Sequence, residues 1–274
     1  MTMKYQIIAM DLDKTLLDSK HRISRENWQA IETLCAMGVH VVPASGRAFE
    51  EMPEELLESK LIRYFITSDG TTVYDRQTDT THELAMSREL GHWVLDRVYQ
   101  YPVCLMIHAD TKSYVELATH NPADYRDFHL NDYWVQFAME KEYPVADLKT
   151  FAYNLPRIQS IVPFFKNMED LKACQACFEA DPRVIIAQTD PYNLEVFDVT
   201  AGKGNALMLL ADLLQIDRKA TIAVGDSTND ATMVRAAGLG LAVDNAVPAL
   251  KAVADAVICD YRQHSAKYIL EHFF

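Results

Sequence analysis

Residues 6–19, QIIAMDLDKTLLDS, carry the pattern from which the fold of this chain can be predicted. The run YQIIAM, residues 5–10, has the length and apolar character of a short buried strand, and two aspartates follow it, Asp11 and Asp13. In extended backbone their side chains point to the same side. Because two like charges at this spacing repel each other, we expect a positively charged group between them.

The chain continues from this strand as alternating helices and strands. Residues 24–38, SRENWQAIETLCAMG, place apolar side chains at helical spacing between a predicted N-cap, Ser24, and a stop, Gly38. VHVVPA (39–44) and YFITSDG (64–70) are typical of short strands, and a helix is predicted over residues 45–59 between them. The last third repeats this rhythm from residue 205. The order predicts an α/β fold, a Rossmann-like doubly wound parallel sheet covered by helices.

The middle of the chain has a different composition. Residues 82–187 are richer in aromatic side chains, hold Trp93 and Trp134, and combine strand-like runs with a helical run. This segment is far too long for a crossover connection and is large enough to fold by itself. We therefore predict a core made of residues 1–81 and 188–274, interrupted by an inserted α+β domain at residues 82–187.

Composition narrows the class of protein. The 274 residues carry 26 Lys and Arg against 39 Asp and Glu, a net charge of −13, so nucleic acid is not an expected partner. No apolar run approaches the roughly 20 residues of a membrane span, and the first residues do not resemble a signal peptide. Five scattered cysteines fit a reducing compartment better than a disulfide framework. A cytoplasmic protein is predicted, and the sequence indicates no oligomeric state.

Four groups of polar residues are predicted to meet at one edge of the parallel sheet. Each follows a predicted strand or begins a predicted helix, and open α/β folds bind ligands at the carboxyl ends of their strands. The groups are Asp11 with Asp13; Ser45, Gly46 and Arg47; Lys203 between two glycines; and GDSTND, residues 225–230.

The acidic groups fit a hard cation, Mg²⁺ above all, which prefers oxygen ligands and accepts phosphate beside them. Asp226 follows its strand directly, as Asp11 does, and is expected to complete the metal site. A structural alternative exists for GDSTND, because Ser227 and Asp230 have the spacing of a capping box. That alternative leaves Asp226 and Asn229 unexplained.

The other two groups fit a bound phosphate. Lys203 is placed at the start of a helix, where its charge meets the positive end of the helix dipole at a cost of roughly 0.3–1 kcal/mol, and a bound anion removes this conflict. Ser45 and Gly46 offer backbone N–H groups for phosphate oxygens if a helix starts there. Helix capping by Ser45 is, however, the more frequent reason for such a pair. Arg47 is as compatible with an ordinary surface position as with a substrate contact.

Together, these side chains predict phosphoryl transfer to a carboxylate. One aspartate attacks phosphorus and forms an aspartyl-phosphate, which water then hydrolyses. Mg²⁺ and the lysine ammonium offset the repulsion between the attacking carboxylate and the phosphate. The second aspartate protonates the leaving alkoxide and later removes a proton from water. These two roles explain why Asp11 and Asp13 are paired.

With these four motifs in this order, the sequence resembles the haloacid dehalogenase-like hydrolase superfamily, and within it the Cof-type sugar phosphatases with a class IIB (C2B-type) cap. DLDKT is similar to the first motif, ASGR to the second, Lys203 in TAGKGNAL to the third, and GDSTND to the fourth. The resemblance covers essentially the whole chain. It implies that the inserted segment 82–187 is a mobile cap that closes over the substrate.

The resemblance also implies a role for each site residue. Asp11 would be the nucleophile and Asp13 the general acid and base. Mg²⁺ would be held by Asp11, the main-chain carbonyl of Asp13 and Asp226, with Asp230 close by or acting indirectly. The implied phosphate ligands are Ser45, Lys203, Asn229 and the N–H groups of Leu12 and Gly46, with Thr15 supporting the loop.

Two residues depart from the family pattern. Lys14 stands where many members have Gly, so the turn after Asp13 must accept a side chain. Asp69 precedes Gly70 where many members have Asn. Neither is expected to touch the chemistry, and Asp69 is expected to act, if at all, on how the hinge of the cap is held.

The predicted function is therefore a Mg²⁺-dependent phosphatase that hydrolyses small phosphorylated metabolites, such as sugar phosphates or phosphorylated cofactors. A phosphomutase is the alternative among enzymes, because the same aspartyl-phosphate can pass its phosphoryl group to another hydroxyl. A non-catalytic phospho-accepting regulatory module is the alternative outside enzymes, although it has no use for Asp13 as a proton carrier. The sequence does not identify the substrate.

Overall fold

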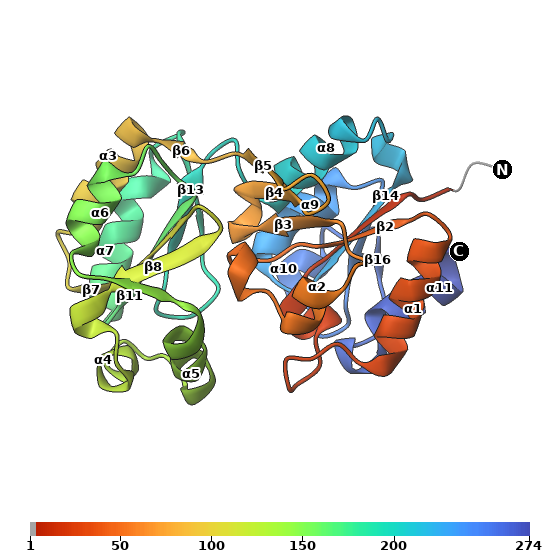
Figure 1. Ribbon diagram of the computed structural model, residues 1–274, viewed down its shortest axis with the longest axis horizontal. Helices are drawn as coiled ribbons and strands as arrows, with labels where there is room; N and C mark the ends of the chain where they lie inside the picture. The colour runs from red at the N-terminus through yellow and green to blue at the C-terminus, as the bar shows by residue number, and fades with distance from the viewer. Residues whose placement is uncertain (1–3) are drawn as a thin grey trace. The chain divides into compact units, whose positions relative to one another are not determined.

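The computed structural model describes residues 4–274, and the chain divides into two compact units. Unit 1 consists of residues 4–47, Met52–His82 and Gly202–Phe274. Unit 2 consists of Ala48–Glu51 and Glu83–Ala201. Each unit has its own sheets and helices, labelled in Figure 1.

Unit 1 is built on a five-stranded parallel sheet. Its strands have the order β16-β15-β14-β1-β2. They are β1 (Ile7–Met10), β2 (His40–Pro43), β14 (Thr221–Gly225), β15 (Leu239–Ala242) and β16 (Ala256–Val257). A second sheet contains β3 (Tyr64–Thr67), β4 (Thr72–Asp75) and β5 (Thr80–Glu83). A parallel bridge between Ala44 and Ile66 joins the end of β2 to β3.

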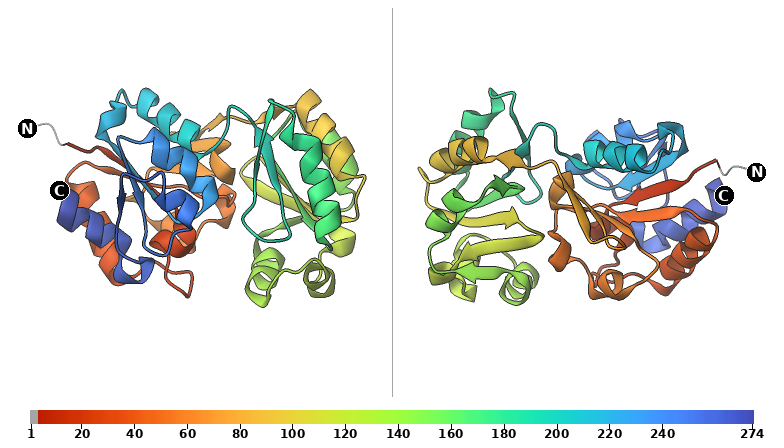
Figure 2. Two further views of the ribbon diagram at one scale, coloured as in Figure 1. Left: turned by 180° about the vertical axis from the view of Figure 1, so that it is seen from behind. Right: turned by 45° about the horizontal axis from the view of Figure 1, so that its top comes forward.

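Helices cover both faces of this sheet (Figures 1 and 2). Helix α1 packs against α11, and α8 packs against α9 on the opposite face. The helices of unit 1 are α1 (Arg25–Ala36), α2 (Glu54–Glu58), α8 (Lys203–Leu213), α9 (Ala231–Ala236), α10 (Pro248–Lys251) and α11 (Ser265–Phe273). The predicted doubly wound α/β core is confirmed. Ser24 caps α1 as predicted, because its side chain accepts a hydrogen bond from Asn27 N at 3.2 Å.

The prediction of a single helix over residues 45–59 is wrong. This segment forms a bend after Ser45, one short turn at Phe49–Glu51, and the five-residue helix α2. Pro53 separates the turn from α2, because a proline has no N–H to donate and disfavours a helical conformation in the residue before it. Ser45 and Gly46 are therefore not at the start of a helix, and the helix-capping interpretation of Ser45 is wrong as well.

Unit 2 contains a six-stranded mixed sheet with the order β12-β13-β11-β7-β8-β9 and a two-stranded sheet, β10-β6. Only β8 and β9 run parallel in the larger sheet. The strands are β6 (Met86–Ser87), β7 (Val103–Ala109), β8 (Lys112–Glu116), β9 (Tyr143–Val145), β10 (Arg157–Ile158), β11 (Ser160–Phe165), β12 (Val184–Ala187) and β13 (Glu195–Asp198).

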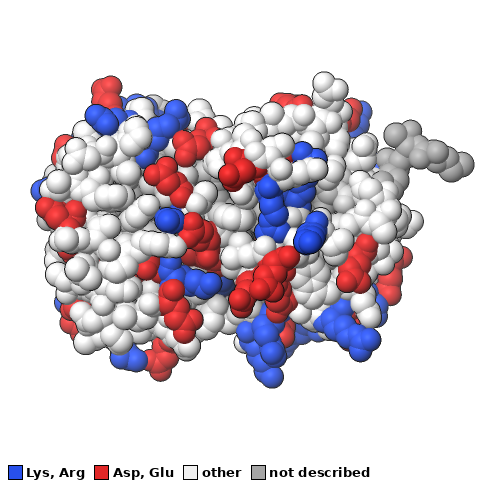
Figure 3. Space-filling view, in the orientation of Figure 1, with Lys and Arg blue, Asp and Glu red and all other residues white. Residues whose placement is uncertain are grey.

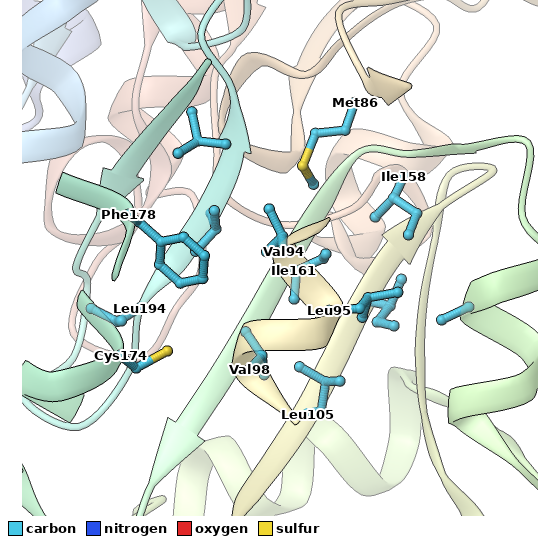
Figure 4. Close-up of a cluster of buried hydrophobic side chains, with 14 of the residues drawn as sticks. Met86, Val94, Leu95, Val98, Leu105, Ile158, Ile161, Cys174, Phe178 and Leu194 are labelled. Atoms are coloured by element: carbon cyan, nitrogen blue, oxygen red, sulfur yellow. The ribbon is translucent and has the colours of Figure 1, made fainter. Parts of the chain in front are cut away.

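Three helices of unit 2 enclose an apolar core against one face of this sheet. They are α3 (Arg88–Val98), α6 (Leu148–Asn154) and α7 (Met168–Glu179). Figure 4 shows this core, in which Val94 and Leu95 of α3 meet Leu105 of β7 and Ile161 of β11. Two further helices, α4 (Pro122–Asp127) and α5 (Asp132–Lys141), bury a smaller cluster around Cys104. Unit 2 is thus an α+β unit inserted into an α/β core.

The unit boundaries differ from the predicted ones at the carboxyl end of the insertion. The prediction returned the chain to the core at residue 188, whereas residues 188–201 lie in unit 2. The cause is β13, which pairs with β11 and β12 inside the six-stranded sheet. The segment Ala48–Glu51 also belongs to unit 2, although it lies in the predicted core. The role of unit 2 as a mobile cap stays a prediction.

The surface reflects the composition. Acidic and basic side chains are interspersed on the face shown in Figure 3. Among residues 4–274, no helix combines the length and the apolar character that crossing a bilayer requires.

Candidate active site

The first part of the site is the loop after β1. Asp11 leaves the sheet with its N–H donating to Val224 O at 3.0 Å, and the tight loop Leu12–Leu16 follows. Lys14 adopts the left-handed conformation, with φ 58°, in which a glycine would be less strained. Ser265 of α11 supports the loop from below, because its hydroxyl donates to Thr15 O at 2.7 Å. The departure at Lys14 therefore costs backbone strain but leaves the loop closed.

The second part is Lys203, the first residue of α8. Its ammonium donates to Asp11 Oδ1 at 2.7 Å and to Asp230 Oδ1 at 2.6 Å, and its side chain is only 1% exposed. Burial by itself would lower the pKa of Lys203, but the charges of Asp11 and Asp230 raise it above its ordinary value. A permanently charged ammonium therefore lies beside Asp11, from a residue 192 positions away in the sequence.

The third part is the loop after β14, which supplies Asp226 and Asp230. Asp230 Oδ2 accepts hydrogen bonds from the N–H groups of Asp226 and Ser227, both at 3.0 Å, so the predicted capping box is present. Its other oxygen accepts from Lys203. Asp230 thus has both a structural role and a place in the site, and the two interpretations of GDSTND are compatible.

Asp11, Asp226 and Asp230 form a group that fits a metal ion. One carboxylate oxygen from each lies within 4.8 Å of the others. The donors are all hard oxygens, which suits Mg²⁺. Within residues 4–274, the Asp226 carboxylate accepts no hydrogen bond, whereas both oxygens of Asp230 do. Asp226 and Asp11 therefore fit direct ligation better than Asp230 does.

The charge balance of this group also favours a cation. Burial, followed by the charge of Asp230, raises the pKa of Asp11 well above its ordinary value. The same two causes raise the pKa of Asp226 to about 7. Two carboxyl groups held in a buried, acidic environment are stabilised in their charged form by a nearby cation. The residues present therefore fit the predicted Mg²⁺.

Asp13 points to a different set of partners. Arg47 donates to both of its carboxylate oxygens, with Nη2 at 2.8 Å from Oδ1 and 2.9 Å from Oδ2, and His21 Nδ1 lies 2.9 Å from Oδ1. Burial opposes ionisation, but the hydrogen bond from His21 and the charge of Arg47 lower the pKa of Asp13. The Asp13 side chain does not belong to the three-carboxylate group, and only its main-chain carbonyl remains a candidate ligand.

The sequence did not identify His21 as a site residue, and it left the role of Arg47 open. Arg47 had been assigned to the surface and to the site with equal weight, and it is only 8% exposed. His21 lies in the connection before α1 and has φ 55°. A histidine in a loop carries no spacing signal, so its contact with Asp13 could not have been found without the tertiary structure.

The predicted phosphate ligands lie in unit 1 beside these carboxylates. Ser45 is buried, and its Oγ accepts a hydrogen bond from Arg47 N at 3.2 Å. Leu12 is completely buried in the loop after Asp11. Asn229 accepts from Ser227 Oγ at 2.5 Å and donates through Nδ2 to Asp69 Oδ1 at 3.1 Å.

The position of Asp69 differs from what the sequence led us to expect. It was expected to stay away from the chemistry, yet its side chain is 2% exposed and contacts Asn229. It also lies directly beneath Gly46, because a Cβ on Gly46 would approach Asp69 Oδ2 to 3.0 Å. The only sequence signal was the departure from Asn at this position.

Comparison with known proteins identifies the family of this chain. A family model described as haloacid dehalogenase-like hydrolase matches residues 8–270. Phosphatase YwpJ of Bacillus subtilis is 28% identical, and the alignment covers 97% of this chain and 99% of that protein. The 5-amino-6-(5-phospho-D-ribitylamino)uracil phosphatase YwtE of the same organism is 26% identical, with 96% of each chain covered.

A solved structure has the same architecture along nearly the whole chain. It is that of a haloacid dehalogenase-like hydrolase from Bacillus subtilis, 25% identical, with a TM-score of 0.82 over 98% of this chain and 100% of that one. The match of the family model, the parallel core with its α+β insertion and the placement of the four motifs lead to one conclusion. This chain is an enzyme of the haloacid dehalogenase-like hydrolase family, of the Cof type.

Proposed function

We propose that this chain is a Mg²⁺-dependent phosphatase that hydrolyses small phosphorylated metabolites through an aspartyl-phosphate on Asp11. The observation that carries the proposal is the buried ammonium of Lys203, 2.7 Å from Asp11 Oδ1, beside the group formed by Asp11, Asp226 and Asp230. A carboxylate held against a fixed cation is suited to approach a phosphate dianion, because the cation offsets their repulsion.

In the first step, an Asp11 carboxylate oxygen attacks the phosphorus of the ester. The new O–P bond forms as the bond between phosphorus and the ester oxygen breaks, and the electron pair leaves with that oxygen. Asp13 supplies the proton that converts the leaving alkoxide into an alcohol. In the observed arrangement Arg47 and His21 favour ionised Asp13, so donation of a proton requires that their hold on it weakens.

In the second step, water attacks the phosphorus of the aspartyl-phosphate and Asp13 accepts a proton from it. The O–P bond to Asp11 breaks, and its electron pair returns to the carboxylate as inorganic phosphate is released. The observed contacts keep Asp13 ionised, which is the state that this step requires, but they also make it a weaker base, so transfer of the proton to Asp13 again requires that the hold of Arg47 and His21 weakens. Lys203 stays charged throughout and remains beside Asp11.

The metal would be held by Asp11, Asp226 and the main-chain carbonyl of Asp13, with Asp230 fixing Lys203 and the loop after β14. When bound, Mg²⁺ supplies positive charge that neutralises phosphate oxygens and orients the ester. Ser45, Asn229 and the N–H groups of Leu12 and Gly46 are the proposed donors to the phosphate. We assign the substrate to the class of small phosphoric monoesters, which the name of the relative YwtE supports.

The proposal is tested with p-nitrophenyl phosphate and Mg²⁺. We expect release of inorganic phosphate from the wild type, loss of that activity in Asp11→Asn, and loss on removal of the metal with EDTA. Lys267→Met, which changes an exposed lysine of α11, is the matched surface control and keeps its activity. Hydrolysis that survives in Asp11→Asn rejects the mechanism.

Analysis of the products separates the two alternatives, with a phosphosugar used as substrate in place of p-nitrophenyl phosphate to test for the phosphomutase. A phosphomutase would return an isomerised phosphosugar among its products. A phospho-accepting regulatory module would form a stable phosphoprotein without turnover. A stable phosphoprotein is not expected, because Asp13 gives the chain a proton carrier for which a regulatory module has no use. Asp13 would serve a phosphomutase as well, so the products obtained from a phosphosugar decide between that enzyme and a phosphatase.

A further inference from the structure

The turn between β3 and β4 has an unusual backbone. Ser68, Asp69 and Gly70 have φ values of 47°, 56° and 81°, so three consecutive residues lie in the left-handed region. For residues other than glycine, this conformation costs on the order of 1–2 kcal/mol each and persists only where the surroundings enforce it. Asp and Asn accept it better than most other residues.

Hydrogen bonds attach this turn to the loop that contains Ser45. Asp69 N donates to Ser45 O at 3.1 Å, and Ser68 N donates to Arg47 O at 2.9 Å. The carboxylate of Asp69 then occupies the space in which a side chain at position 46 would lie. The conformation of the turn Ser68–Gly70 and that of the loop containing Ser45 and Gly46 therefore depend on each other.

The turn also meets the start of α8. A Cβ on Gly70 would come within 2.3 Å of Gly202 C and 2.4 Å of Lys203 N. The turn thus contacts the backbone from which Lys203 extends, in addition to the loop of Ser45 and Gly46. Three proposed phosphate ligands are supported by these two sets of contacts.

The contact between Asp69 and Asn229 fixes the direction of an amide. A carboxylate can only accept, so Asn229 Nδ2 must face Asp69 and Oδ1 must face the Ser227 hydroxyl. Asp69 uses one hydrogen of Nδ2 and leaves the second for another acceptor. An Asn at position 69 could donate or accept, and it would leave both orientations of the Asn229 amide possible.

We propose that Asp69 is a positioning residue of the phosphate site, which holds the Asn229 amide with one N–H free for a phosphate oxygen and fixes Gly46 above it. The inference rests on the proposed function, since the phosphate is the group that Asn229 and Gly46 would bind. It assigns a role to a residue that lies in none of the four motifs.

A carboxylate beside a phosphate site raises two opposite expectations. If Asp69 contributed only its charge, Asp69→Asn would remove a repulsion and tighten the binding of phosphate. If Asp69 orients Asn229, the same substitution weakens binding, because the amide can turn its oxygen toward the phosphate. The sign of the change therefore distinguishes the two explanations.

The experiment measures the dissociation constant of inorganic phosphate by calorimetry with Mg²⁺ present. We expect Asp69→Asn and Asn229→Ala each to weaken binding by about tenfold, as for loss of one hydrogen bond to a charged group. In the double variant, Asp69→Asn should add little to Asn229→Ala, because its effect passes through that amide. Affinity that is unchanged or tighter in Asp69→Asn overturns the inference, as does full additivity in the double variant.

Two controls keep the result specific. Asp75→Asn changes another buried aspartate of the same three-stranded sheet, which pairs with Arg63 at 2.8 Å, and should leave phosphate affinity unchanged. Thermal unfolding of Asp69→Asn checks that it is folded, and Asn tolerates the left-handed backbone. If the wild type hydrolyses p-nitrophenyl phosphate but Asp69→Asn binds phosphate normally, only this inference fails. If the wild type neither binds phosphate nor hydrolyses the ester, both proposals fail.

Discussion

Lys203 and its two carboxylate partners illustrate how single residues determine this site. An ammonium that is almost completely removed from water is tolerated because Asp11 and Asp230 both accept from it. A buried ion pair often contributes little net stability, since desolvation offsets the attraction between the charges. Removal of one partner, however, leaves an uncompensated buried charge. We therefore regard Lys203 as a residue kept for chemistry rather than for folding.

The proton-transfer role of Asp13 can be tested through the leaving group. An aryl ester such as p-nitrophenyl phosphate leaves without help, whereas an alkyl phosphate needs a proton. We expect Asp13→Asn to lower kcat/KM for an alkyl phosphate by about 10²- to 10⁴-fold, the range of general acid catalysis. For p-nitrophenyl phosphate the loss should be far smaller. Steady-state kinetics with both esters provide the measurement.

An equal loss with both esters would contradict this role for Asp13. Such a result would indicate that the substitution disturbs the loop Leu12–Leu16 or the metal rather than proton transfer. Asp18→Asn is a suitable control, because Asp18 lies in the connection that follows this loop and its carboxylate accepts hydrogen bonds from the backbone N–H groups of Lys20 and Arg22.

At the scale of single residues, the sequence identified candidate site residues where a predicted strand leads directly into polar side chains. Asp11 and Asp226 could be selected because each directly follows an apolar strand, and Lys203 because a cation at a helix start is unfavourable without an anion. His21 and Asp69 follow no such rule. Their side chains reach the site through loop conformations with positive φ, which spacing in the sequence does not reveal.

At the scale of elements, the turn Ser68–Gly70 packs against the start of α8 and helps to fix the backbone from which Lys203 extends. Gly70→Ala would place a methyl group 2.3 Å from Gly202 C and force alanine into a left-handed backbone. We expect a loss of about 2–4 kcal/mol in the free energy of unfolding, the sum of strain and displacement. Denaturant titration measures it.

Gly91→Ala in α3 is the matched comparison for this change. Its added Cβ would approach only the flexible end of Ile158, at 3.0 Å from Cδ1, inside a regular helix. Alanine favours the helix by up to about 1 kcal/mol, so this variant should stay within about 1 kcal/mol of the wild type. Equal free energies of unfolding for Gly70→Ala and Gly91→Ala would show that the turn accepts the added methyl group without loss of stability.

Glu142 of unit 2 leads us to predict that the stability of the folded chain depends on pH. Glu142 follows α5 and accepts a hydrogen bond from Tyr125 OH at 2.6 Å. Burial raises the pKa of Glu142 to about 8, and the charge of Glu51 adds to this increase, while the bond from Tyr125 opposes it. Between pH 4.5 and 8 the folded chain therefore binds a proton that the unfolded chain has released.

Stability should consequently fall as pH rises through this range, by up to about 1.4 kcal/mol per pH unit. Glu142→Gln removes the titrating group and should flatten this part of the profile. Melting temperatures of both proteins at several pH values between 5 and 9 provide the comparison. Identical slopes would mean that Glu142 is ionised in the folded state.

At the scale of the whole molecule, the division into two units has a consequence for metal binding. All proposed ligands belong to unit 1, although they come from its first and last segments. A metal that binds only the folded arrangement stabilises it by mass action, by about 1.4 kcal/mol for each tenfold increase in its concentration above Kd. Mg²⁺ should therefore raise the melting temperature.

Asp226→Asn should lose this dependence on Mg²⁺, because it removes a proposed ligand. Asp244→Asn should keep it, since Asp244 pairs with Lys251 at an exposed position on the same unit. Scanning calorimetry at several Mg²⁺ concentrations measures the melting temperatures of the wild type and of these two variants. A melting temperature that rises equally in all three proteins would assign the metal to another site.

The sequence by itself determined the α/β class, the presence of an inserted unit and the order of the four motifs. These features are local or periodic, because a strand, a helix start and a stop each depend on neighbouring residues. The boundary at residue 188 was wrong because β13 belongs to its unit through pairing with β11, a strand about 35 positions earlier, and such pairing has no local signal.

Only the tertiary structure decided which side chains meet. It brought Lys203 to Asp11 and Asp230, separated the side chain of Asp13 from the metal group, and placed Asp69 beneath Gly46. Each of these contacts depends on how loops from distant strands pack at one edge of the sheet. Packing is a property of the folded chain as a whole, and for that reason the sequence could propose candidates such as Asp11, Asp226 and Lys203 but could reveal neither their exact contacts nor the involvement of His21 and Asp69.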